Sequence, residues 1–403
     1  MRPPALAGAR NSPPMSMPAS PSITARPTVV EVNLGRLADN LRAVAAHVQR
    51  PVMAVVKANA YGHGLVPAAW TFLAAGASQL GVAFVEEGLE LRRAGITAPI
   101  LVLGGLLGQQ IGAFLDYDLT IGVASPEKLR HVDEAAEQTG RRAKVHLKID
   151  TGMGRLGKRW DRCAEFFAQG AATEHCDVLG VYSHFANADA QDPSFAREQL
   201  DHFVAATSFY EREGLPTPVR HMANSGAVLG HPEAWLDMVR PGILLYGVYP
   251  GPEAQRTIEV QPALTLKTRV VFYKVVDEGL SVGYDLTWRA PRTTRVVTLP
   301  IGYGDGYARA LSNRGEVLIE GVRRPIVGRM SMDQCNVDLG DGTAYNGDEV
   351  VLIGAQGAGR ITVEEVAAWV DTIPYEILTM LGSRIPRYYV DDSAAANAVA
   401  SLG

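Results

Sequence analysis

The sequence lacks the residues and patterns that mark several common classes of protein. It has only three cysteines, Cys163, Cys176 and Cys335, and no Cys-x-x-Cys pair or Cys/His set with metal-ligand spacing. A structural zinc site or a disulfide framework is therefore not expected. The net charge of −5 is mild, and it gives no indication of the positively charged surface that binds nucleic acid. No run approaches the roughly 20 apolar residues of a membrane helix. These absences fit a cytoplasmic protein with no metal, nucleic-acid or membrane partner.

The first 27 residues differ in composition from the rest of the chain. They are rich in Pro, Ala and Ser, and they show no hydrophobic periodicity. Pro13 and Pro14 interrupt the only apolar stretch that a signal peptide could use. We therefore expect a disordered tail over residues 1–27.

Residues 28–258 alternate short apolar runs, rich in β-formers, with amphipathic helical patterns. Eight runs are almost continuously apolar, as in strands buried on both faces of a parallel sheet. They begin near Val52, Gln79, Pro99, Leu119, Ala143, Val178, Val219 and Met238. Eight strand–helix units predict a (β/α)8 barrel of the TIM type, an α/β fold, whereas the alternative, a doubly wound sheet, would more often use fewer strands.

Two further segments complete the predicted organisation. The run from Thr28 to Leu34 alternates polar and apolar residues, need not belong to the barrel, and could pair with the later β segment. From about Val260, alternating segments are separated by Gly-containing turns, with one convincing helix in VEEVAAWVDT. This pattern predicts a mostly antiparallel β domain over residues 259–403, with a boundary near the turn-rich stretch at 250–252.

Reactive side chains recur where the predicted barrel strands end, which is where enzymes of this fold carry their active sites. They are Lys57, Arg155, His184, Asn224 and Ser225, together with Arg240 within the eighth strand. A surface lysine or a core histidine could occupy any one of these places, but several converging positions favour a site.

Lys57 has the surroundings of a reactive amine. A lysine that closes an apolar strand can lose its hydration, which lowers its pKa and frees the amine for Schiff-base formation. The following residues contain Gly62 and Gly64, which let a backbone approach a ligand closely, and Tyr61 can donate a hydrogen bond to a phosphate.

The stretch VVKANAYGHG (55–64) closely resembles the cofactor-lysine motif of alanine racemases. The resemblance continues, in family order, through KIDTGMGR (148–155), HMANSG (221–226), RPGI (240–243), GY (283–284), IGYGDG (301–306), GRMSMD (328–333) and PYE (374–376). It covers roughly residues 28 to 390. The resemblance implies an enzyme that uses pyridoxal 5′-phosphate to interconvert L- and D-alanine and so supplies D-alanine for peptidoglycan.

The resemblance also implies two catalytic bases, one on each face of the substrate carbanion. Lys57 would hold the cofactor and act on one face, and Tyr284 would act on the other. A free tyrosine has a pKa of about 10, so it needs neighbouring positive charge or hydrogen bonding to act near neutrality. In the family, Tyr284 reaches the site across a homodimer interface together with Met332 and Asp333.

The remaining roles follow from the same resemblance. Arg240 would face the pyridine nitrogen, and because arginine stays charged and only donates, that nitrogen would stay unprotonated and transamination would be suppressed. Arg155 would bind the substrate carboxylate, supported by Lys148, whose position is carbamylated in many relatives. His184 would pack against the cofactor ring or support Arg240, with a core histidine as its alternative. The phosphate and ring would be held by Tyr61, Asn224, Ser225, Gly242, Ile243 and Tyr375.

The sequence offers three alternatives to an alanine racemase. Asp285 follows Tyr284 where the commonest family pattern has glycine, which leaves a serine or broader-specificity racemase open. A decarboxylase of the same architecture would carry a Gly-rich phosphate loop and a cysteine-acidic substrate motif in its β domain, and we find neither. A non-catalytic cofactor carrier would lack the β domain, and with it Tyr284. The sequence therefore favours the racemase.

Overall fold

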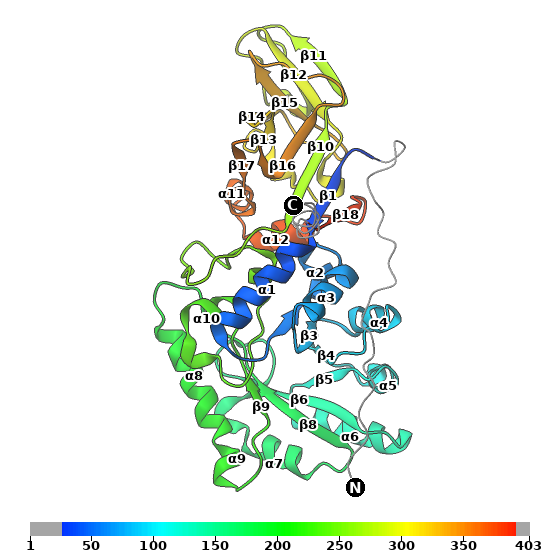
Figure 1. Ribbon diagram of the computed structural model, residues 1–403, viewed down its shortest axis with the longest axis vertical. Coiled ribbons are helices and arrows are strands. Elements are labelled where there is room, and N and C mark those ends of the chain that lie inside the picture. The colour runs from blue at the N-terminus through cyan, green and yellow to red at the C-terminus, as the bar shows by residue number, and fades with distance from the viewer. Residues whose placement is uncertain (1–25, 392–403) are drawn as a thin grey trace, which may run out of the picture.

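The computed structural model describes residues 26–391 (Figure 1). It has two parts, a helix-covered parallel barrel and an elongated sheet domain at one end of it. The tail expected over residues 1–27 lies outside the described residues except for Arg26 and Pro27, as does the end of the predicted β domain, residues 392–403.

The first part confirms the predicted barrel. Seven parallel strands are neighbours in the order in which they occur in the chain. They are β2 (Met53–Val55), β3 (Gln79–Val82), β4 (Ile100–Val102), β5 (Thr120–Val123), β6 (Ala143–Asp150), β8 (Cys176–Tyr182) and β9 (Val219–His221). A two-residue strand, β7 (Lys158–Arg159), pairs with the end of β6.

The eighth predicted strand is reduced to a short closing segment. Val239 forms a parallel bridge with Val52, and the Met53 amide donates to the Val239 carbonyl at 2.9 Å, which joins the last segment to the first strand. Pro241 has no N–H to continue the ladder, and the chain turns at Gly242 into the 3-10 helix η4 (Ile243–Tyr246). The barrel therefore closes, but Arg240 lies in this short segment and not within a regular strand.

Helices cover the outside of the barrel (Figure 1). One of them, α6, begins after Ser125, whose hydroxyl accepts from the Lys128 amide, and ends at Gly140 in the left-handed region. The helices of this part are α1 (Leu34–Val48), α2 (Lys57–Tyr61), α3 (Leu65–Ala74), α4 (Val85–Arg93), α5 (Ile111–Asp116), α6 (Pro126–Thr139), α7 (Ala164–Ala172), α8 (Ser194–Thr207), α9 (Phe209–Arg212) and α10 (Ser225–Gly230). None of the described helices is long and apolar enough to cross a membrane.

The second part is a sheet in the order β11-β12-β15-β14-β13-β16-β10-β1-β18, with β17 paired to β16. Its pairs are antiparallel except that of β1 with β18. The strands are β1 (Val29–Asn33), β10 (Leu264–Arg269), β11 (Phe272–Val276), β12 (Thr294–Leu299), β13 (Glu316–Ile319), β14 (Val322–Val327), β15 (Cys335–Gly340), β16 (Glu349–Gln356), β17 (Gly359–Ile361) and β18 (Arg387–Val390). The early strand β1 thus lies in this sheet and not in the barrel.

Two helices, α11 (Val363–Trp369) and α12 (Pro374–Met380), complete the second part, and α12 lies against the barrel beside α2 (Figure 1). At this junction the Arg387 guanidinium donates to the Gly62 carbonyl at 3.2 Å. A Cβ on Gly62 would stand 2.2 Å from the Leu378 carbonyl oxygen, so no larger residue fits there. The two parts therefore meet at Gly62, at the end of the turn that Lys57 begins.

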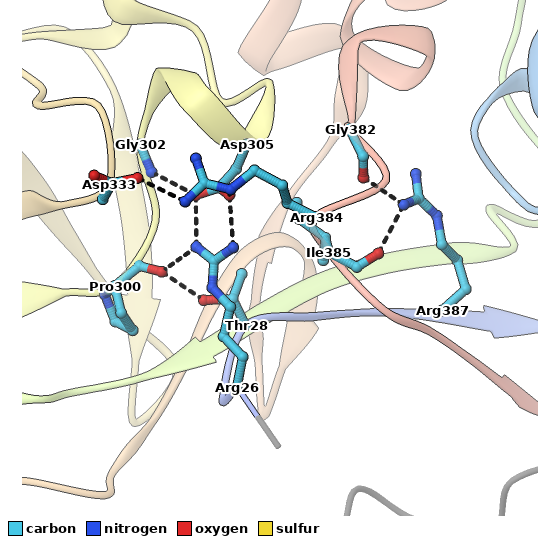
Figure 2. Close-up of polar contacts among 10 residues, drawn as sticks. All are labelled: Arg26, Thr28, Pro300, Gly302, Asp305, Asp333, Gly382, Arg384, Ile385 and Arg387. Atoms are coloured by element: carbon cyan, nitrogen blue, oxygen red, sulfur yellow. Dashed lines mark hydrogen bonds and ion pairs between the residues drawn. The ribbon is translucent and has the colours of Figure 1, made fainter. Parts of the chain in front are cut away.

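A buried carboxylate joins the beginning of the described chain to the second part (Figure 2). The Arg26 guanidinium donates to both oxygens of Asp305 at 2.6 and 2.5 Å and to the Pro300 carbonyl at 2.6 Å. Arg384 approaches the same carboxylate at 3.4 Å and bonds to Asp333 at 2.6 Å. Arg26, which the composition had placed in the tail, is therefore fixed by the fully buried Asp305.

Candidate active site

A cavity of about 540 Å³ opens at the end of the barrel where the strands finish. All but three of the residues singled out from the sequence contribute to its wall: Lys57, Tyr61, Lys148, Arg155, His184, Asn224, Ser225, Arg240, Gly242, Ile243 and Tyr375. Most of them come from barrel segments, whereas Tyr375 comes from α12 of the second part. One cavity thus collects side chains from both parts of the chain.

Lys57 enters this cavity from an unusual piece of backbone. It follows β2 and starts α2, whose next residues, Ala58, Asn59, Ala60 and Tyr61, all have φ between 51° and 55°. Burial lowers the pKa of the Lys57 amine, as does the charge of Arg155. A lowered pKa leaves more of the amine unprotonated near neutrality, the form that can act as a nucleophile or base.

Hydrogen-bond donors gather at the other side of the cavity. The backbone N–H groups of Gly242 and Leu244 both point at the Ser225 hydroxyl oxygen, at 3.0 and 3.3 Å. Burial raises the pKa of Tyr61, so its hydroxyl stays protonated and can donate. A Cβ on Gly242 would lie 2.2 Å from the Tyr61 oxygen. Backbone and hydroxyl donors can therefore approach one ligand group closely, because residue 242 carries no side chain.

Asn224 supports this arrangement from the start of α10. Its side-chain oxygen accepts from the Ala227 amide at 3.1 Å and so caps the helix whose first residue is Ser225. The capped helix start thus carries Asn224 and Ser225 side by side in the cavity wall.

Arg240 is held by a chain of buried groups on the floor of the cavity. Its guanidinium donates to His221 Nδ1 at 2.9 Å and to the Ser183 carbonyl at 2.7 Å. His221 Nε2 lies 2.7 Å from His146 Nδ1. Burial lowers the pKa of Arg240 to about 10, which still leaves it charged at neutral pH.

His146 and His221, the two histidines in this series of hydrogen bonds, are neutral. Burial lowers the pKa of His146 to about 3 and, with the Arg240 charge, lowers that of His221 well below its usual range. Because His221 Nδ1 accepts from Arg240, its proton is assigned to Nε2, from which it donates to His146. The pair thus offers Arg240 an acceptor without a neutralising charge.

His146, His221 and Tyr182 were given no role from the sequence. Tyr182 stacks on the His221 ring, with centroids 5.2 Å apart, and its own ring centroid lies 4.7 Å from Lys148 Nζ. The alternation of side chains along a strand could have pointed to His146, because it lies two residues before Lys148 in the same strand and so faces the same side. His184, which had two possible roles, lies 3.4 Å from the Arg240 guanidinium through Nδ1.

Lys148 and Arg155 also line the cavity. Burial, with the charges of Arg240 and Arg155, lowers the pKa of Lys148 well below its usual value, which disfavours the charged form of this amine. Arg155 is exposed at the mouth, on a loop that Asp150 fixes by accepting from the Gly152 and Gly154 amides at 3.0 Å each. The exposed Arg155 guanidinium at the mouth can therefore receive an anionic ligand group.

The remaining three predicted residues, Tyr284, Met332 and Asp333, do not line this cavity. Tyr284 and Met332 are 69% and 53% exposed on the surface of the second part. Asp285, the departure from the family pattern, approaches Arg329 Nε with its carboxylate at 3.4 Å. Tyr284, the residue predicted to be the second base, therefore lies outside the barrel cavity of its own chain.

Comparisons with known proteins agree along the chain. Models of the alanine racemase N-terminal domain and C-terminal domain match residues 32–250 and 263–389. Alanine racemase of Desulforamulus reducens is 44% identical over 370 residues, covering 90% of this chain and 99% of the relative. Alanine racemase 2 of Bacillus subtilis is 41% identical over 372 residues, covering 90% and 94%.

Solved structures give the same result. Alanine racemase from Streptomyces lavendulae superposes with a TM-score of 0.87 at 40% identity, covering 91% of this chain and 98% of that one. The Bacillus anthracis enzyme, solved with bound L-Ala-P, gives a TM-score of 0.86 at 38% identity, covering 92% and 96%. These relatives favour neither a decarboxylase nor a non-catalytic carrier. The chain belongs to the alanine racemase family.

Proposed function

We propose that this chain interconverts L- and D-alanine in the barrel cavity, with pyridoxal 5′-phosphate held by Lys57. The observation that carries the proposal is the convergence of a partly buried lysine, a set of neutral donors and a buried arginine on one cavity. Alanine racemases of bacteria are among the relatives, and one neighbouring structure, from Bartonella henselae, has covalently bound pyridoxal phosphate.

The residues of the cavity fit this cofactor. A phosphate dianion prefers backbone N–H groups and hydroxyl donors, and Tyr61, Ser225, Gly242, Ile243 and Tyr375 would supply them. Residue 242 carries no Cβ, which leaves room for the phosphate beside Tyr61. When bound, the cofactor supplies an electron-withdrawing ring that weakens the bond between the substrate α-carbon and its proton.

Arg240 would limit what that ring can do. It stays charged and only donates, and its partner His221 is neutral, so the arginine has no proton to give away at neutral pH. A ring nitrogen facing it would remain unprotonated, and electron withdrawal would be moderate. This arrangement suits an enzyme that relocates a single proton and avoids longer side reactions.

Lys57 and Tyr284 would move the proton. The lowered pKa of Lys57 favours the free amine, the form that would accept the α-proton on one face and return it. Tyr284, exposed on the second part, would serve the opposite face of a site in a second copy of the chain, with Met332 beside it. Two such sites would be shared in a homodimer.

Arg155 would hold the alanine carboxylate at the mouth. The lowered pKa of Lys148 favours its neutral amine, which would add carbon dioxide and release a proton to become a carbamate, and that anion would orient the Arg155 guanidinium. Asp333 supports the Met332 loop through its ion pair with Arg384. We place the enzyme in the cytoplasm, where D-alanine is needed for peptidoglycan.

The test is a racemisation assay of the purified protein with chiral detection, together with the absorbance of bound cofactor. Lys57→Ala should lose both the lysine-linked absorbance and turnover, since the attachment point and one base are removed together. Lys144→Ala, which removes an exposed lysine paired with Asp118, is the matched control and should behave as wild type. An active Lys57→Ala protein would overturn the proposal.

A further inference from the structure

The backbone that follows Lys57 is a left-handed helical turn. Ala58, Asn59, Ala60 and Tyr61 have φ values of 53°, 55°, 52° and 51°. Residues with a Cβ avoid this region because the Cβ crowds the following carbonyl, and a run of four is costly. Such a turn persists only where the surroundings hold it, so the groups that hold it also fix where Lys57 points.

Glu87 holds the first residue of this turn from another part of the chain. Its Oε1 accepts from the Ala58 amide at 2.6 Å. Its Oε2 accepts from the Ala83 amide at 2.7 Å and the Phe84 amide at 3.2 Å. One carboxylate thus links the Lys57 turn to the connection between β3 and α4.

The two carboxylate oxygens of Glu87 accept hydrogen bonds from different segments of the chain. Glu87 is the third residue of α4, and a glutamate there ordinarily returns to the backbone at the helix start, which Oε2 does at Phe84. That contact needs only one oxygen. The second oxygen reaches outside its own helix to Ala58, a contact that helix capping does not require.

Glu87 also balances the charge around Lys57. Arg155 and Arg240 both lower the pKa of the Lys57 amine, and the Glu87 carboxylate raises it. Glu87 therefore acts on Lys57 in two ways. Its hydrogen bond to the Ala58 amide helps to fix the position of Lys57, and its negative charge raises the pKa of the Lys57 amine.

We propose that Glu87 is a positioning residue for Lys57, whose carboxylate fastens the left-handed turn to the start of α4 and thereby aims the lysine amine into the barrel cavity. Its meaning for catalysis rests on the proposed racemase function. The fastening itself is a property of the fold and can be measured without any turnover.

Glu87→Gln is the decisive variant because it keeps the size of the side chain and removes one acceptor oxygen and the charge. A glutamine carbonyl can serve Ala58 or the pair Ala83 and Phe84, but not both. Glu86→Gln is the matched control, since it removes the same charge one residue away from an exposed side chain in the same helical turn.

The first measurement is hydrogen–deuterium exchange of peptides covering residues 57–64. We expect the Ala58 amide of Glu87→Gln to exchange about tenfold faster or more than in Glu86→Gln, since a bond to a charged acceptor is lost. Equal protection in both variants, with wild-type protection elsewhere, would overturn the proposal.

The second measurement follows Lys57 directly. The protein freed of cofactor is mixed with pyridoxal phosphate over a range of pH, reduced with borohydride, and the labelled Lys57 peptide is quantified. Loss of the Glu87 charge should shift the pH midpoint of labelling downward, because a negative neighbour no longer favours the charged amine. Among active variants, kcat should fall with little change in KM for alanine. An unshifted midpoint together with unchanged kcat would contradict the proposal.

These readouts separate the two hypotheses. If wild type labels at Lys57 but does not racemise alanine, the proposed function fails while exchange and labelling still decide the role of Glu87. If wild type does not label at all, the proposed function fails and exchange alone decides it.

Discussion

Replacing Arg26 with alanine should destabilise the second part of the protein, because the buried Asp305 carboxylate would lose its bidentate partner. Arg26 donates to both Asp305 oxygens at 2.6 and 2.5 Å, and Asp305 has no exposed side-chain surface. A carboxylate that stays buried without compensation is costly, and the cost falls on the folded state alone.

The magnitude follows from what remains after the substitution. Removing one partner of a fully buried ion pair costs about 3–5 kcal/mol. Here the Gly302 amide still donates to Asp305 at 3.1 Å, Arg384 stays at 3.4 Å, and Arg26 was itself 26% exposed. We therefore expect the free energy of unfolding to fall by about 2–3 kcal/mol, at or just below the lower end of that range.

The assay is urea unfolding of the cofactor-loaded protein, followed by circular dichroism. Arg42→Ala is the control, because Arg42 and Asp39 form a 2.7 Å pair whose side chains are 60% and 71% exposed. Such a surface pair contributes about 0–1 kcal/mol. If Arg26→Ala unfolds at the same urea concentration as Arg42→Ala, the contact does not stabilise the fold and the reasoning is refuted.

The pH dependence gives a second check on the same contact. Burial raises the pKa of Asp305, but the hydrogen bonds from Arg26 and Gly302 outweigh it, and the net pKa is lowered. A lowered folded-state pKa stabilises the protein above the unfolded value of about 3.9, and this stabilisation is lost as the pH falls through the folded pKa. The difference between wild type and Arg26→Ala should therefore be full near neutrality and shrink below about pH 4.

Two further predictions concern the cavity and the second base. Gly242→Ala should weaken pyridoxal phosphate binding about tenfold or more, because a Cβ 2.2 Å from the Tyr61 oxygen must displace that donor. Gly105→Ala adds a methyl group to the same cavity where nothing lies within 4 Å, so equal dissociation constants for the two variants would disprove the close approach. Tyr284→Phe should slow α-deuterium exchange far more from one alanine enantiomer than from the other, and near-normal rates from both would remove Tyr284 as a base.

The sequence predicts the architecture well because hydrophobic period is a local property. Apolar runs and their flanking turns are enough to find the barrel strands, and Pro241 explains why the last one is short. The partners of β1 were left open, since an alternating strand can complete either sheet. Only long-range pairing with Leu264–Arg269 and Arg387–Val390 decides that question.

The sequence predicted most of the residues that line the cavity, but not the geometry that brings them together. Lys57 could be found from its motif, yet no local preference favours four left-handed residues after it, because the stabilising contact comes from Glu87 on a different helix. The Arg240–His221–His146 chain was missed for a similar reason, since its members come from three separate barrel segments. Tyr284 is different again, because its proposed site belongs to a second copy.

The position of β1 has a consequence for how the protein is made. β1 leaves the ribosome before the barrel, but both of its partners, β10 and β18, are synthesised after the barrel is complete. During synthesis β1, whose side chains are mostly buried in the folded protein, must therefore remain unpaired while the barrel is made. Its pairing is complete only when β18, the last described strand, has been synthesised. A cut after the barrel would separate β1 from both of its partners and leave its backbone N–H and C=O groups unpaired, an edge that favours aggregation.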